Sequence, residues 1–97
     1  MRHFHRTQLT PADVLAMADD FFPAIRLERT ASRERTRTYH GPLGTATVNA
    51  HPEGGHYTFI EVDTDQVGES RLDRNVKRYF VTVHRTADPT HTLRAAF

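Results

Sequence analysis

The feature that most constrains the fold is the segment from residue 70 to residue 84. At helical spacing its apolar residues gather on one face and its basic residues on the other. The apolar residues are Leu72, Val76, Tyr79, Phe80 and Val83. The basic residues on this segment and just beyond it are Arg71, Arg74, Lys77, Arg78 and Arg85. We therefore predict a helix over residues 70–84 that packs on a sheet and exposes a basic face.

Two local signals bear on this helix. Ser70 and Asp73 suit its first turn, because a hydroxyl can accept from a free backbone amide and a carboxylate stabilises the positive end of the helix dipole. A strand over residues 79–84 is the competing interpretation, since aromatic and β-branched residues there favour strands. A strand would mix polar and apolar residues on both faces, so the helix is preferred.

The length and composition indicate one small domain. A chain of 97 residues can bury one modest core, so we expect a single domain over residues 1–97. Residues 86–97 form either a flexible tail or a closing segment that docks through Leu93 and Phe97. The sequence has no apolar run near the ~18 residues of a membrane span and contains no cysteine. We expect a cytoplasmic protein that does not contact a membrane.

The N-terminal part predicts a strand followed by a helix. Residues 2–7 alternate between polar and apolar side chains, which indicates a strand. Thr10 suits a helix cap, Pro11 suits the first helical position, and Asp13 suits the first turn. Pro23 disfavours helical geometry at the residue before it, so the helix is expected to end at Phe22.

Three extended segments are expected between the two helices. They span residues 24–39, 45–51 and 56–64, with turns at residues 40–44 and 52–55. The last segment carries large apolar groups on both faces, Tyr57 and Phe59 on one and Ile60 and Val62 on the other. This pattern predicts a central strand that is covered on both sides.

The predicted fold is an α+β two-layer sandwich. An antiparallel sheet of about four strands carries two amphipathic helices on one face, in the order β-α-β-β-β-α. In its order of elements the chain resembles the helix-grip (START-like) ligand-binding families. The resemblance implies, as one alternative, a pocket for a small apolar ligand between the helices and the sheet.

Residues able to carry chemistry do not form a recognisable motif. His3 and His5 would face the same side of a strand, and His51 and His56 flank one turn, but no zinc-binding spacing is present. We therefore expect no metal and no cofactor. No catalytic residue is predicted either, and a binding protein is expected rather than an enzyme.

A group of acidic residues, Glu61, Asp63 and Asp65, lies along one strand face and its extension. Close carboxylates can raise each other's pKa, which is a property of acid-base catalysts. A strand end of this kind is more commonly solvated or paired across the sheet. Arg35 and Arg37 are the predicted partners.

Two surfaces remain as candidate binding sites. The first is an aromatic surface on the sheet, made of Tyr57, Phe59 and Asn49, and it favours a self-associating module, a homodimer. The second is the basic surface of the last helix, made of Arg71, Arg74, Lys77 and Arg78. It gives the alternative of a nucleic-acid-associated protein, although the whole chain has a net charge of only +1.

Overall fold

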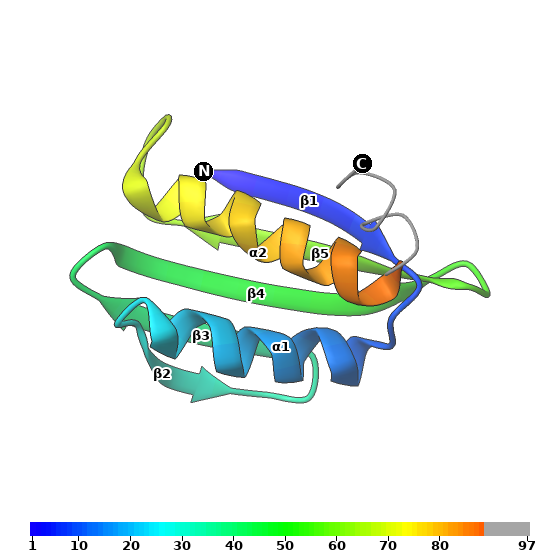
Figure 1. Ribbon diagram of the computed structural model, residues 1–97. Helices are drawn as coiled ribbons and strands as arrows, with labels where there is room; N and C mark the ends of the chain where they lie inside the picture. Colours follow the sequence, from blue (N-terminus) through cyan, green and yellow to red (C-terminus); the bar gives the residue numbers. More distant parts are fainter. Residues whose placement is uncertain (89–97) are drawn as a thin grey trace.

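The computed structural model describes residues 1–88 and shows an α+β fold. Five antiparallel strands form one sheet in the order β1-β5-β4-β3-β2, and two helices lie on the same side of it (Figure 1). The elements are β1 (Arg2–Thr7), α1 (Pro11–Ala24), β2 (Glu28–Ser32), β3 (Thr36–Gly41), β4 (Gly44–Glu53), β5 (Tyr57–Thr64) and α2 (Arg71–Ala87). The predicted fold class is confirmed, with five strands in place of about four.

The helix predicted from the 70–84 segment is confirmed as α2, and the competing strand is wrong. The Ser70 hydroxyl caps this helix by accepting from the backbone N–H of Asp73 at 3.0 Å. Thr10 caps α1 in the same way. Helix α2 continues to Ala87, so residues 86 and 87 belong to it and not to a tail. The predicted docking residues Leu93 and Phe97 lie outside the described residues.

The predicted end of α1 at Phe22 is wrong, because the helix passes through Pro23 to Ala24. It then closes with a Schellman turn, in which Leu27 N–H donates to the Phe22 carbonyl at 3.1 Å and Arg26 N–H donates to the Pro23 carbonyl at 3.0 Å. A proline in the last turn removes only one helical hydrogen bond. The buried ring of Phe22 offsets that loss.

The predicted single extended segment over residues 24–39 is also wrong. It contains the end of α1 and then two strands, β2 and β3, which pair as an antiparallel hairpin. Arg33 N–H donates to the Thr36 carbonyl at 2.8 Å and closes the turn between them. This turn contains neither glycine nor proline, so the usual sequence signals for a turn are absent.

Three aromatic rings join the helices to the sheet. The ring of Phe22 lies 4.9 Å from that of Tyr39 and 5.3 Å from that of Tyr79. The Tyr79 hydroxyl donates to the Val14 carbonyl at 2.8 Å, so its buried polar end is satisfied. These rings fill the space between the two helices and the sheet at this point.

A buried carboxylate, Asp73, joins α2 to two strands. It is 1% exposed and accepts hydrogen bonds from His3 Nε2 at 2.7 Å, Thr64 Oγ1 at 2.8 Å and Ser70 Oγ at 2.6 Å. Burial alone would raise the pKa of Asp73, but the bonds from His3, Ser70 and Thr64 outweigh it and lower the pKa to about 2. The ionised carboxylate therefore belongs to the folded state.

Helix α2 gives a prediction about the core. The sequence predicts that Phe80 is buried, but Phe80 is only partly buried, whereas its neighbour Tyr79 is fully buried. We expect Tyr79→Ala to lower the free energy of unfolding by about 3–5 kcal/mol and Phe80→Ala by about 1–2 kcal/mol. Denaturant unfolding measures both, with Val81→Ala as the exposed control on the same helix. A Phe80 effect as large as that of Tyr79 contradicts the assigned packing.

Asp73 gives a prediction about pH. Because its pKa is lower in the folded state than its ordinary value of 3.8, its stabilisation is full above pH ~4 and is lost as the pH falls toward 2. We expect roughly 2 kcal/mol of the free energy of unfolding to disappear over that range. Asp73→Asn should remove this part of the pH dependence, as followed by denaturant unfolding at each pH.

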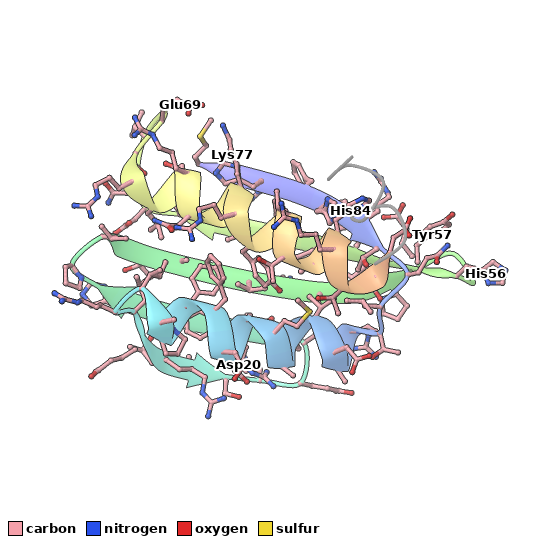
Figure 2. The ribbon with its side chains drawn as sticks, viewed as in Figure 1. Asp20, His56, Tyr57, Glu69, Lys77 and His84 are labelled. Atoms are coloured by element: carbon pink, nitrogen blue, oxygen red, sulfur yellow. The ribbon has the colours of Figure 1, made fainter. Side chains whose placement is uncertain are left out.

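The control for this experiment is Asp20→Asn. Asp20 is exposed on α1, a different helix from that of Asp73 (Figure 2). The free energy of unfolding of the Asp20→Asn variant should depend on pH as that of the parent protein does. Identical curves for the two variants would mean that Asp73 does not contribute through its charge.

Candidate functional site on the open face of the sheet

The face of the sheet away from the helices, here called the open face, carries the predicted aromatic surface. Along β5 the residues Thr58, Ile60, Val62 and Thr64 are buried under the helices. Tyr57, Phe59, Glu61 and Asp63 alternate with them and point to the open face. The predicted two-faced strand is present. Both helices lie on one side of it (Figure 1), so residues 1–88 cover only one face, and the cover of the other face stays a prediction.

An aromatic patch forms around Phe59 on this face. We define it as Phe4, His51, Tyr57 and Phe59, which β1, β4 and β5 supply. The rings of Phe4 and His51 each lie 5.4 Å from the ring of Phe59. The guanidinium carbon of Arg6 lies 5.1 Å from the same ring, in a cation–π contact. Phe4 is 54% exposed and Tyr57 is 50% exposed, so the patch presents apolar surface to solvent.

Charged pairs of both signs border the aromatic patch. Arg2 Nε lies 2.9 Å from Asp63 and 3.1 Å from Glu61, and Arg6 Nε lies 2.8 Å from Glu53. The predicted partners Arg35 and Arg37 are therefore wrong for these acids. The reason is the strand order, which places β1 beside β5 and puts β4 between β5 and β3.

The third predicted residue of the aromatic surface, Asn49, also lies on the open face. It is exposed and sits between Glu61 of β5 and Thr36 of β3 in the strand register. Its neighbours are thus polar, and the aromatic rings gather around Phe59 instead. The sequence analysis did not assign Phe4 and Arg6 to this surface. The alternation of Arg2, Phe4 and Arg6 along β1 does indicate that they share one face of the strand.

The predicted basic surface lies on the outer side of α2. Arg71, Arg74, Lys77 and Arg78 are all exposed. Lys77 Nζ forms an ion pair with Glu69 at 2.8 Å, near the start of the helix (Figure 2). Arg78 donates to Asn75 Oδ1 at 3.2 Å. Hydrogen bonding to Lys77 lowers the pKa of Glu69, so part of the positive charge of this surface is already balanced.

Ser70, Asp73 and His3 lie together but are not arranged as a nucleophile with its base. In a hydrolytic triad the serine hydroxyl faces the histidine, and the carboxylate lies behind that histidine. Here both the Ser70 hydroxyl and His3 Nε2 donate to the carboxylate of Asp73. The hydroxyl also caps α2, so the geometry supports a structural role.

The second histidine of β1, His5, faces the same side of the strand as His3, as predicted, and this side faces the helix layer. Its ring stacks on Phe80 with 5.2 Å between centroids, and the ring of His84 meets its edge at 6.4 Å. Burial and the charge of His84 lower the pKa of His5, so it is neutral at physiological pH. Within residues 1–88 no three histidine or acidic side chains come together as a possible metal site.

None of the helices formed by residues 1–88 is long and apolar enough to cross a membrane. No protein-family model and no curated protein sequence matches the chain.

Proposed function

We propose that the protein is a small, non-enzymatic interaction module that forms a homodimer through the open face of its sheet. The observation that carries the proposal is the half-exposed ring of Phe4, 5.4 Å from that of Phe59, together with the half-exposed Tyr57 on the same face of β5. Exposed aromatic rings in a single contiguous patch are a common feature of protein-binding surfaces. Burying them against a second copy would supply the favourable free energy of association.

The charges around the patch suit a second copy of the same chain. A two-fold interface brings the same residues of each protomer together, so it requires a self-complementary surface. The open face has cationic Arg2 and Arg6 beside anionic Glu53, Glu61 and Asp63. Each charge can therefore face an opposite charge on the partner after rotation by 180°.

A face-to-face dimer is favoured over pairing through a sheet edge. The edge strand β2 has a bulge between Arg29 and Ala31, and all five of its residues are exposed. Bulges and charged side chains discourage edge-to-edge pairing. The proposal includes a cytoplasmic location, the ordinary one for a small chain without cysteines.

The dimer gives a direct prediction. Sedimentation equilibrium should show a mass that rises from that of one chain at about 10 μM to twice that mass at about 1 mM, as expected for a weak dimer. Tyr57→Asp and Phe4→Asp should each give a folded monomer, because a buried unpaired carboxylate strongly disfavours the interface. Val81→Asp is the matched control, since Val81 is 47% exposed on the opposite layer of the protein, and it should leave the dimer intact.

Three outcomes would contradict this dimer. The first is a single-chain mass for the intact protein at about 1 mM. The second is a dimer that persists in Tyr57→Asp but is absent when the chain is ended at Asp88. Residues 89–97 would then form the dimer contact. Third, if the intact protein is a monomer and a chain ending at Asp88 aggregates, residues 89–97 cover the open face.

A second candidate function is association with nucleic acid through α2. The observation that favours it is that Arg71 and Arg74 are exposed on the same helix as Lys77 and Arg78. If these side chains bind phosphates, affinity for an oligonucleotide should fall steeply with salt, and combined alanine substitution of Arg71, Arg74 and Arg78 should abolish it. Fluorescence anisotropy measures both. No binding at ~50 mM salt would exclude this function, because counterion release is most favourable at low salt.

A further inference from the structure

The C-terminus of α1, the β3–β4 turn and the start of α2 lie at the same end of the molecule (Figure 1). A cleft there is lined by residues of all three. Its volume is about 510 Å³, within the range of roughly 300–1,000 Å³ that is typical of small-molecule sites. The side chains that line the cleft include three arginines and three others, namely Arg26, Arg71, Arg78, Ile25, Leu43 and Asn75. We propose that this cleft binds a small phosphate ester, with the three guanidinium groups on the phosphate and the apolar side chains on its organic part.

The three arginines of the cleft, like Arg33 and Arg74 outside it, differ in charge balance from the four arginines of the sheet that pair with acids. On the sheet, Arg2 and Arg6 form ion pairs with carboxylates, and Arg29 and Arg37 share Asp19. In the part of the chain that the structure describes, Arg26, Arg71 and Arg78 form no ion pair with a carboxylate. No acidic residue lines the cleft. A bound anion would therefore relieve the repulsion between these positive charges.

The backbone of Arg26 provides an independent observation. Arg26 has φ of +70° and follows the C-cap of α1, a position that usually belongs to glycine. A side chain held in this conformation carries a conformational cost, and such positions concentrate at ligand sites. The fold also fixes Arg26 in place, because a Cβ atom on Gly41 would lie only 2.1 Å from the Arg26 carbonyl oxygen. The β3–β4 turn thus packs tightly against this arginine.

The chemistry of the cleft favours a phosphate group. Guanidinium groups are planar, always charged and matched to phosphate oxygens through paired N–H donors. Asn75 orients the guanidinium group of Arg78. Its Oδ1 accepts a hydrogen bond from Arg78, and its Nδ2 donates to the Arg71 carbonyl at 2.9 Å, which holds the amide in place. The apolar side chains of Ile25 and Leu43 are partly buried beside these donors. A concave site with one apolar wall suits a small ester better than the extended backbone of a nucleic acid.

The test uses phenyl phosphate as the probe and the full-length protein. Titration followed by backbone amide NMR should give saturable shifts at residues 24–27, 42–43 and 71–78, with Kd of about 1 mM, as expected for a fragment-sized ligand. Phenol lacks the phosphate and should not bind. Inorganic phosphate lacks the ring and should bind at least about tenfold more weakly, because it cannot use the apolar wall.

The decisive variant is Arg26→Gly. It should weaken phenyl phosphate binding by at least about tenfold without lowering Tm, since glycine adopts positive φ without strain. Arg71→Ala should weaken binding to a similar degree, and thus provides a second variant. Arg33→Ala removes the same charge from an exposed turn outside the cleft and should bind like the parent.

Three results would overturn the proposal. One is the absence of saturable shifts with phenyl phosphate. Another is an equal loss of affinity in Arg26→Gly and Arg33→Ala, which would indicate general charge attraction. The third is displacement of phenyl phosphate by an oligonucleotide whose binding depends as strongly on Arg74 as on Arg26, which would assign the surface to nucleic acid.

Discussion

The fold depends on the contact between Phe22 of α1, Tyr39 of β3 and Tyr79 of α2. The ring of Phe22 lies 4.9 Å from that of Tyr39 and 5.3 Å from that of Tyr79, so the three buried rings join both helices to the sheet. The hydroxyl of Tyr39 donates to Asp19 at 2.7 Å, so the polar end of this ring is satisfied at the margin of the core. Two helices on one side of five strands leave the second side of the sheet without a partner among residues 1–88. That constraint produces the open face.

The two candidate surfaces lie on different layers of the molecule and have different chemistry. The open face combines Phe4, Tyr57 and Phe59 with paired charges of both signs, which suits contact with another folded protein surface. The cleft on the helix layer has unpaired cationic groups around Arg26, which suits a small anion. Because no described contact joins the two surfaces, occupation of one is compatible with occupation of the other. The proposed dimer would leave the clefts of both protomers open to solvent.

Periodicity was sufficient to predict the helix layer, the sheet and the outward placement of Tyr57 and Phe59. It failed where the backbone took a conformation that composition does not signal. The turn between β2 and β3 contains no glycine, and α1 continues past Pro23, which removes only one helical hydrogen bond so near the end of the helix. The cleft could not be predicted, because Arg26 reaches it through a positive φ and a contact with the distant Gly41. Such sites depend on tertiary geometry.

The central claim is that the open face is the surface through which this protein associates. The most direct test is a dilution series of amide NMR spectra, from about 1 mM to about 10 μM, a range that spans the dissociation of a weak dimer. The account predicts concentration-dependent shifts at Phe4, Tyr57 and Phe59 and along β1 and β5, with α2 unchanged. Shifts confined to α2, or spectra that do not change with dilution while the mass stays that of one chain, would contradict it.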